Sequence, residues 1–204
     1  MEENYGFYAL LDRMIYINRW ALMRNSRYEN IKEHSFDVAV IAQSLALIHN
    51  NLVDEGKTAV KVDPLLIATY GLYHDCTEII TGDMPTPIKY RNDTLKNAYK
   101  QVEREAALSL TSQLPDSLQE QYLSWLSPSY DGEEGTIAKR IVKAADKIAA
   151  YIKCLREKLA GNTEFDNAMK TTKQTIDNID LPEVGIFMEH FIPSFGLTLD
   201  ELNK

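Results

Sequence analysis

The sequence predicts an all-α protein that folds as one domain. Apolar residues recur at the three- and four-residue spacing of amphipathic helices over most of the chain, and the alternating pattern of half-buried strands is nearly absent. With 204 residues, of which 45% are hydrophobic, the chain can bury one substantial core. The two candidate linkers, residues 50–62 and 127–135, are too short to separate domains. We therefore expect residues 1–204 to form a single domain.

The first three predicted helices lead to a His-Asp pair. Apolar spacing indicates a helix over about residues 7–15 and a second over 36–48, with His34 in or near its first turn. An Asp-Pro dipeptide at 63–64 is typical of an N-cap followed by the first helical position, and it opens a third helix. This third helix is expected to bring the pair at 74–75 close to its end.

The second half of the chain contains the longest predicted helix. Apolar residues from 95 to 110 indicate a helix that stops before Pro115, and residues 118–126 suit a short one. A continuous helical pattern then runs over 137–159 and is ended by Gly161, as glycine commonly does at a helix C-terminus.

The charge balance argues against polyanionic partners. Lys and Arg number 22 against 30 Asp and Glu, and the net charge of −8 disfavours non-specific binding to nucleic acid polymers and anionic membranes. The first four residues are acidic without an apolar leader, and no stretch approaches 18 apolar residues, so we expect a cytoplasmic protein. Cys76 and Cys154 form no disulfide framework and are expected to be free thiols.

Two histidines and two aspartates make a candidate metal site: His34, His74, Asp75 and Asp146. An N/O ligand set without thiolate suits Mn, Fe, Co, Ni or Zn, and it leaves positions open for water and a substrate oxygen. Asp146 lies among small apolar residues in mid-helix, where a carboxylate is costly to bury unless it is paired or binds a metal. A core histidine beside a solvent-exposed aspartate is the alternative interpretation of the pair at 74–75.

Two further carboxylates follow the pair closely. Glu78 lies four residues after His74 and three after Asp75, so in a continuing helix it would share their face. Asp83 follows a glycine in a Pro-rich turn, a placement that can aim a carboxylate at a ligand. Metal ligands and candidate proton-transfer groups are therefore expected to converge in this segment.

These residues resemble a known family. His34, the pair at 74–75 and Asp146 fit the H…HD…D pattern of the HD-domain metal-dependent phosphohydrolases. Longer matches look like the YfbR-like branch of bacterial 5'-deoxynucleotidases and extend over nearly the whole chain. They comprise residues 17–20, 22–25, 33–35, 81–83, 85–87, Lys143 with Ala145 and Asp146, 187–189 and 193–195.

The resemblance implies an HD-type helical bundle with a core over about residues 30–150 and flanking helices packed on it. It also implies hydrolysis of 2'-deoxyribonucleoside 5'-monophosphates to deoxynucleoside and phosphate, with selectivity against ribonucleotides. One divalent transition metal, Co, Mn, Zn, Fe, Ni or Cu, is expected on the four ligands, because a dinuclear site needs more ligands than the motifs supply. A homodimer is implied by the resemblance alone.

Arg19 and Trp20 are the expected substrate-binding pair. The guanidinium fork of Arg19 matches phosphate oxygens and would orient the phosphate for attack. An apolar pocket rejects an added hydroxyl only weakly by desolvation, so exclusion of a 2'-OH would come from a clash with the rigid ring of Trp20. Without the resemblance, a surface arginine beside a core tryptophan would be the simpler interpretation. The resemblance also places these residues at the nucleotide: His74, Asp83, Met84, Pro85, Thr86 and Asp146.

The expected mechanism follows from these roles. A bound metal would lower the pKa of a water molecule and withdraw charge from a phosphoryl oxygen. Glu78 is the first choice for the general base or water-positioning carboxylate, and Asp83 is a close second. Arg19 would offset the charge of the phosphoryl group in the transition state, with the nucleoside 5'-oxygen as leaving group.

Two other functions stay open at this point. Another HD enzyme, such as a nucleotide phosphodiesterase or an alarmone hydrolase, should carry extra histidine ligands or a basic groove, and the sequence shows neither. A catalytically silent metal- or nucleotide-binding module should lack Glu78 and Asp83, and both are present. The remaining histidines are expected to be structural, His49 at a helix end and His190 packed in an aromatic cluster.

Overall fold

The all-α prediction is confirmed by the computed structural model, which describes residues 4–89 and 91–203. The acidic chain start, residues 1–3, lies outside this part. Among the described residues the only β-type pairing is an isolated bridge between Asn18 and Asn30. In chain order the helices are α1 (Phe7–Asp12), η1 (Arg13–Tyr16), α2 (Ile31–Asp54), α3 (Pro64–Tyr73), α4 (Glu78–Thr81), α5 (Thr86–Lys89), α6 (Asp93–Thr111), α7 (Asp116–Leu126), α8 (Gly132–Leu159), η2 (Thr163–Phe165), α9 (Asp166–Asp177), α10 (Pro182–His190), η3 (Ile192–Gly196) and α11 (Leu199–Leu202).

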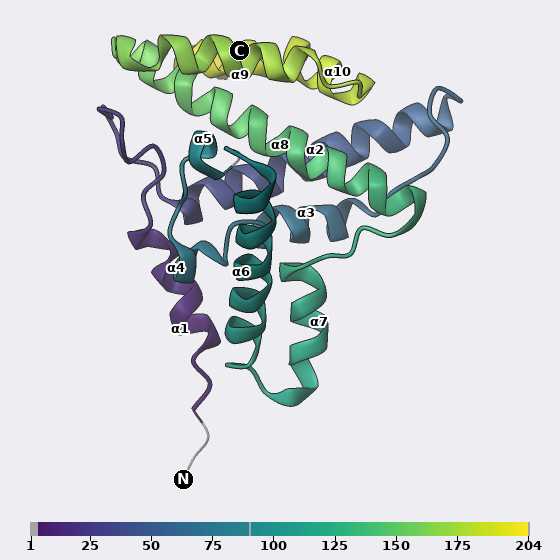
Figure 1. Ribbon diagram of the computed structural model, residues 1–204. Helices are drawn as coiled ribbons and strands as arrows, with labels where there is room; N and C mark the ends of the chain where they lie inside the picture. The colour runs from purple at the N-terminus through teal and green to yellow at the C-terminus, as the bar shows by residue number, and fades with distance from the viewer. Residues whose placement is uncertain (1–3, 90, 204) are drawn as a thin grey trace.

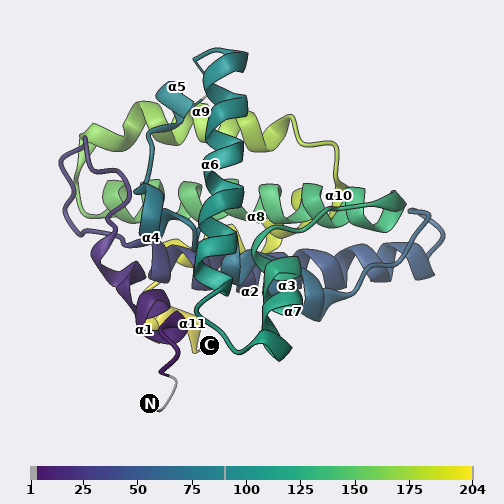
Figure 2. The same ribbon diagram turned by 60° about the horizontal axis from the view of Figure 1, so that its bottom comes forward.

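Helices α2, α3 and α8 form the centre of the fold and pack directly on one another. Figure 2 shows α9, α8 and α2 running side by side, with α6 crossing them. In Figure 1, α1, α6 and α7 lie together below this layer. The long central helices thus provide a rigid frame on which the shorter helices and loops are placed.

Two groups of buried apolar side chains stabilise this arrangement. The larger group joins α2, α3, α8 and α10 and includes Leu45, Ile67 and Ile148. The smaller group joins α1, the start of α2, α6 and α7 and includes Phe7 and Leu110. Each such side chain contributes about 1.5–3 kcal/mol when it is fully buried, so the two groups supply most of the folding free energy.

Side-chain caps fix the starts of α2 and α3. The Asn30 side chain accepts hydrogen bonds from the backbone amides of Lys32 and Glu33 and so caps the helix that carries His34. Asp63 caps α3 in the same way, with proline at the first helical position, as the sequence predicted. A cap of this kind contributes about 1 kcal/mol and sets the residue at which the helix begins.

Gly71 lets α3 approach α2 unusually closely. A Cβ atom at this position would lie 2.9 Å from the Ala39 Cα atom and 3.1 Å from the Ala39 backbone nitrogen. Only a residue without a side chain fits between the two backbones. The rings of His34 on α2 and His74 at the end of α3 consequently lie 5.2 Å apart, centroid to centroid.

The His-Asp pair lies at the end of α3, as the sequence predicted, and the continuing helix that would place Glu78 on the same face is not formed. Helix α3 ends at Tyr73, and a separate short helix begins at Glu78. One physical reason lies in His74, whose Nδ1 atom is 2.7 Å from the carbonyl oxygen of Gly71. In a continuing helix that oxygen would accept the amide of Asp75, so the imidazole replaces a backbone hydrogen bond at this point.

Other boundaries also differ from the prediction. Helix α2 extends through residues 50–54 and α8 starts at Gly132, so each expected linker is partly helical. The shortened first linker is closed by Asn50, whose side chain exchanges two hydrogen bonds with the backbone of Val62. Helices α9 and α10 were not predicted, because α9 has a largely polar sequence and α10 is short.

The two remaining histidines behave differently. His49 is buried, with Nδ1 3.1 Å from Glu183 Oε1 and Nε2 2.9 Å from the Val60 carbonyl oxygen. These contacts agree with a structural role, although His49 lies inside α2 and not at its end. The predicted packing of His190 in an aromatic cluster is wrong, because His190 is exposed. The rings of Phe187 and Phe191 do contact each other.

Helix α2 is long and apolar enough, by length and composition alone, to cross a membrane. The sequence did not predict such a stretch, because polar residues interrupt the apolar ones along this helix. In the structure the apolar face of α2 packs into the larger core, and the same helix holds His34 and His49 buried. Its apolar character is therefore that of a central core helix. Cys76 and Cys154 are free and buried.

Replacing Gly71 with alanine should destabilise the fold and disturb the site. The added Cβ would clash with the Ala39 backbone, and we expect a loss of about 1–3 kcal/mol in the free energy of unfolding. The matched control is Gly185→Ala in α10, where no atom lies within 4 Å of the new Cβ and alanine typically gains about 0.5–1 kcal/mol. Chemical denaturation of both variants measures the difference. A Gly71→Ala protein as stable as the wild type would contradict the close approach.

Candidate active site

Four side chains from α2, α8 and the turn that follows α3 converge where these three helices meet. One ligand atom each of His34, His74 and Asp146 can be chosen so that all three lie within 4.8 Å of one another. The Nε2 atom of His34 lies 3.1 Å from Asp146 Oδ1 and 3.6 Å from Asp75 Oδ2. The four predicted metal ligands are therefore brought together although they are spread over more than a hundred residues of sequence.

The contacts of His74 fit a bound cation. Its Nδ1 atom donates to the Gly71 carbonyl oxygen, which leaves the lone pair of Nε2 facing the site. This Nε2 atom is buried without a hydrogen-bond partner, yet it lies 3.0 Å from Asp75 Oδ2. An imidazole lone pair and a carboxylate oxygen at this separation repel each other unless a proton or a metal ion lies between them.

The local charges favour the protonation states that metal binding needs at His34, Asp75 and Asp146, whereas at His74 the Asp75 charge outweighs burial and raises the pKa. Burial and the nearby Arg19 charge lower the pKa of His34, so this imidazole is neutral at pH 7. Burial opposes ionisation of Asp146, but the His34 hydrogen bond and the Lys147 charge outweigh it and hold the pKa well below its usual range. Asp75 is likewise held ionised, mainly by His74. A neutral imidazole and two carboxylates are ready-made ligands.

Arg19 lies beside the predicted metal ligands and contacts two acidic side chains, Glu29 and Asp146. Its Nη1 atom donates to Glu29 Oε2 at 2.7 Å and to His34 Nδ1 at 2.9 Å, and Nη2 lies 3.7 Å from Asp146 Oδ1. An arginine nitrogen can only donate, so His34 Nδ1 accepts in this arrangement. Coordination of a metal through His34 Nε2 would put the proton on Nδ1, and Arg19 Nη1 would then have to move away from it.

Trp20 adopts a strained backbone conformation next to Arg19. Its φ angle is +58°, in the left-handed region that residues other than glycine rarely occupy. The indole ring packs edge-on against Phe165, with centroids 5.4 Å apart, and its Nε1 atom is buried without a hydrogen-bond partner. Strain and an unsatisfied donor together are typical of a residue held in place for binding.

A cavity of about 500 Å³ opens beside this arginine and tryptophan. The described residues that line it include Arg19, Trp20, Asp83, Pro85 and Lys147. Alanine and threonine side chains of α9 also line it. The volume suits a ligand of nucleotide size. Of the other residues expected at a nucleotide, His74, Met84 and Asp146 are not among the described lining residues, and the side chain of Thr86 lies outside the described part.

Glu78 and Asp83 lie near the ligands but in different settings. Glu78 begins α4, and its Oε2 atom is buried without a hydrogen-bond partner. Burial, together with the charges of Asp75 and Asp83, raises the pKa of Glu78 to about 9. Asp83 follows Gly82, whose φ of +71° turns the chain, and it lines the cavity with a pKa that burial raises.

Sequence reasoning missed a buried ion pair that holds the Arg19–Trp20 loop in place. Glu157 accepts hydrogen bonds from the backbone and hydroxyl of Ser26 and from the amide of Arg27, and it pairs with Lys153 one turn earlier on α8. The Lys153 amine also donates to the Arg27 carbonyl and lies over the Phe165 ring that contacts Trp20. From the sequence alone, Lys153 and Glu157 look like an ordinary exposed ion pair along one helix. Only their burial in the structure reveals that they hold the loop in place.

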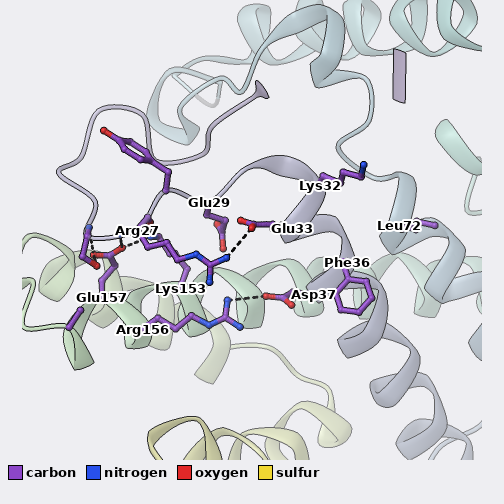
Figure 3. Close-up of a pocket in the computed structure, with 13 residues that line it drawn as sticks. Arg27, Glu29, Lys32, Glu33, Phe36, Asp37, Leu72, Lys153, Arg156 and Glu157 are labelled. Atoms are coloured by element: carbon purple, nitrogen blue, oxygen red, sulfur yellow. Dashed lines mark hydrogen bonds and ion pairs between the residues drawn. The ribbon is translucent and has the colours of Figure 1, made fainter. Parts of the chain in front are cut away.

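Figure 3 shows this ion pair from the side of a separate groove of about 750 Å³. The basic groups around that groove are already paired, Arg27 with Glu33 and Arg156 with Asp37. The metal-ligand cluster lies elsewhere, beside the smaller cavity. We therefore place the candidate active site at the smaller cavity. Glu29 and Lys147 also belong to it, and neither stood out in the sequence.

The fold and the His/Asp cluster together define the class of HD-type metal-dependent phosphohydrolases. A solved HD-domain phosphohydrolase from Listeria innocua superposes with a TM-score of 0.73 at 23% identity, over 93% of this chain and 88% of its own. The cyanophage S-2L HD phosphohydrolase DatZ, solved with dA and one catalytic Zn²⁺ ion, gives a TM-score of 0.57 at 20% identity, over 91% and 96%. These similarities establish the fold.

The chain belongs to the YfbR-like 5'-deoxynucleotidase family, whose model matches residues 6–195. Relatives described as 5'-deoxynucleotidases in Yersinia pestis (strain Pestoides F) and Yersinia pseudotuberculosis (serotype O:1b, strain IP 31758) are each 44% identical over 197 residues. The match covers 97% of this chain and 96% of each relative. The expected family and the HD-type fold are therefore confirmed.

Replacing Glu157 with glutamine should destabilise the protein by about 3–5 kcal/mol, because the buried Lys153 charge would lose its partner. The matched control is Asp177→Asn, which breaks the exposed Lys173–Asp177 pair of identical spacing and should cost at most about 1 kcal/mol. Urea denaturation measures both.

The pH dependence of the same measurement provides a second check. Although burial opposes its ionisation, hydrogen bonds from Lys153 and Ser26 hold the pKa of Glu157 well below its usual range. The stabilisation is therefore present above the unfolded-state pKa of about 4.3 and is lost as the pH falls towards the folded-state value. The gap between the wild type and Glu157→Gln should narrow in acid. A gap that does not depend on pH would show that the charge of Glu157 does not matter.

Proposed function

We propose that this protein hydrolyses 2'-deoxyribonucleoside 5'-monophosphates to a deoxynucleoside and inorganic phosphate, with one divalent transition metal. The observation that carries the proposal is the position of Arg19, which touches the ligand cluster through His34 and Asp146 and lines the adjacent cavity. A phosphate held by this guanidinium would therefore lie between the metal ligands and the space for the nucleoside. The 5'-deoxynucleotidase relatives at 44% identity support the substrate class.

His34, His74, Asp75 and Asp146 would hold the metal, which suits the mixed N/O donors. When bound, a divalent metal supplies Lewis acidity, which draws charge from a phosphoryl oxygen and favours ionisation of a water molecule. Reconstitution of the metal-free protein with each ion in turn would identify which metal supports activity: Co, Mn, Zn, Fe, Ni or Cu.

Arg19 orients the phosphate and offsets its charge in the transition state. The guanidinium is already fixed by Glu29, so little side-chain freedom is lost when a phosphate binds. Lys147, which lines the same cavity, adds a second positive charge near the phosphate. Together the two cations counter the negative field of the carboxylates, which would otherwise repel the substrate.

Glu78 transfers the proton in the reaction, and Asp83 positions the substrate from the cavity wall. The Glu78 carboxyl is buried, unpartnered and close enough to Asp75 for their charges to interact. Its raised pKa favours the protonated form, which suits donation of a proton to the leaving 5'-oxygen and disfavours the base role expected from the sequence. Asp83 lines the cavity directly, which favours contact with the nucleotide.

Trp20 excludes the ribose 2'-hydroxyl by steric contact. The ring is held by Phe165 and by its strained backbone, so it cannot swing aside easily. A rigid wall can discriminate a hydroxyl that desolvation alone would reject only weakly. Asp83 and Pro85 line the same cavity and complete the proposed nucleotide site.

A cytoplasmic location and a homodimer are also part of the proposal. The exposed side chains Phe36, Val40 and Leu47 on α2 and Leu65 and Leu72 on the adjacent α3 leave apolar area at the surface of two packed helices. Such area commonly marks a protein interface. Sedimentation velocity of the purified protein measures the oligomeric state.

The direct test is phosphate release from a panel of deoxy- and ribonucleoside 5'-monophosphates, with cyclic nucleotides included to detect a phosphodiesterase. We expect activity on the deoxynucleotides with a divalent metal and none after chelation. Asp146→Ala should lose both metal and turnover, because it removes a carboxylate held ionised at the ligand cluster. Full metal content and normal turnover in that variant would overturn the assigned ligand set.

Glu78→Gln should keep metal and nucleotide binding but lose turnover by about 10²- to 10⁴-fold, the typical contribution of a proton-transfer group. Glutamine retains the size of the side chain, so packing is preserved. Asp83→Asn is the comparison, and its main expected effect is a higher KM. If Asp83→Asn lost turnover while Glu78→Gln remained nearly normal, the two roles would be exchanged.

Trp20→Ala should lower the deoxy-to-ribo ratio of kcat/KM, because the wall beside the 2' position is removed. Some loss of absolute activity is expected from the cavity that the truncation leaves. The ratio cancels such general damage and reports differential transition-state binding. An unchanged ratio would place sugar recognition elsewhere, most plausibly in the loop at Asp83 and Pro85.

A further inference from the structure

A row of lysines leads across the surface towards the candidate active site. Helix α8 carries three of them at four-residue spacing, and the first turns of α6 carry two more. We call this set the lysine row: Lys96 and Lys100 on α6, and Lys139, Lys143 and Lys147 on α8. The five lysines do not stand out as a basic groove in the sequence, because they belong to two helices that are distant along the chain.

The three α8 lysines lie on one face of the helix, and the last of them reaches the cavity. Residues four apart share one face of a helix, so Lys139, Lys143 and Lys147 form a line along α8. Its last member, Lys147, lines the cavity and contacts Asp146 at 3.0 Å. Lys143 is close enough to the other four lysines for their charges, together with burial, to lower its pKa.

The charges of the row are largely uncompensated. Within the described part of the chain, Lys96, Lys100 and Lys143 form no ion pair, and Lys139 lies over the Tyr130 ring. The neighbouring acid Glu103 on α6 is already paired with Lys89. Five clustered ammonium groups repel one another, so their proximity costs stability unless an anion is bound there for part of the time.

We propose that the lysine row is a docking site for the phosphate dianion of the substrate, which it captures outside the cavity and passes along α8 to Arg19. The proposal rests on the proposed function and adds to it how a protein with a net charge of −8 attracts an anionic substrate. A local positive potential at the mouth of a cleft can raise association rates by about 10- to 10³-fold.

The test uses the metal-loaded protein with Lys100→Gln/Lys143→Gln, since neither residue lines the cavity. At low ionic strength we expect kcat/KM for a deoxynucleoside monophosphate to fall about three- to tenfold with kcat unchanged. The difference should shrink to less than about twofold near 0.5 M salt, where the Debye length is only a few ångströms. The affinity for inorganic phosphate, measured by calorimetry, should weaken in parallel.

The matched control is Lys57→Gln/Lys61→Gln, which makes the same change in net charge beyond the far end of α2. That helix places these residues roughly 30 Å from His34 at 1.5 Å per residue, so the salt dependence should match the wild type. An equal loss in the control would mean that only net charge matters, and it would overturn the proposal. An equally weakened inhibition constant for the neutral deoxynucleoside product would also overturn it, because that would report damage to the cavity.

Two further outcomes separate the hypotheses. An oligodeoxynucleotide that binds the row more tightly than inorganic phosphate does, at equal phosphate concentration, would assign the row to a polymer and contradict the proposal. If the wild type released no phosphate from any deoxynucleotide, the proposed function would fail. The phosphate calorimetry would still test the row in that case, because it needs no turnover.

Discussion

The candidate active site depends on the close contact between α2 and α3. Gly71 allows the two backbones to meet at Ala39, and this contact sets His74 opposite His34. The carbonyl of Gly71 also accepts the Nδ1 proton of His74, so the same residue that permits the approach orients the ligand. Helix α8 then needs only to present Asp146 to the two imidazoles. A small change in the spacing of these helices would disperse the ligands, because protein cores do not deform smoothly.

Around this centre the protein concentrates features that are unfavourable for stability. The carboxylates of Asp75 and Asp146 lie half-buried against the same His34 nitrogen, Glu78 has an unpartnered carboxyl oxygen, and Trp20 is strained. Each of these costs free energy, and each is offset by neighbouring structure. Local violations of folding rules gathered in one place are a mark of a site shaped for binding and chemistry.

The loop that carries Arg19 and Trp20 shows how the rest of the fold supports the site. The loop itself has few helical contacts, yet Glu29 holds the guanidinium and the Lys153–Glu157 pair holds the loop backbone. Breaking a buried ion pair of this kind is costly, which makes it an effective anchor for an irregular segment. The residues that we propose face the substrate are thereby positioned by α8, the same helix that supplies Asp146 and three members of the lysine row.

The sequence by itself determined the all-α fold, the cap at Asp63 and the four ligand candidates. Helical periodicity, capping chemistry and ligand type are properties of neighbouring residues or residue identity, and they can be read without coordinates. It also pointed to Arg19, Trp20, Asp83 and Pro85, which the structure places at one cavity.

Only the tertiary structure decided how distant groups meet. The break after Tyr73 follows from a side chain competing with a backbone amide, and helix periodicity cannot show such competition. The buried state of Lys153 and Glu157 and the gathering of lysines from α6 and α8 depend on which helix faces pack together. The physical reason is common to these cases: burial and charge act through space, and the sequence orders residues only along the chain.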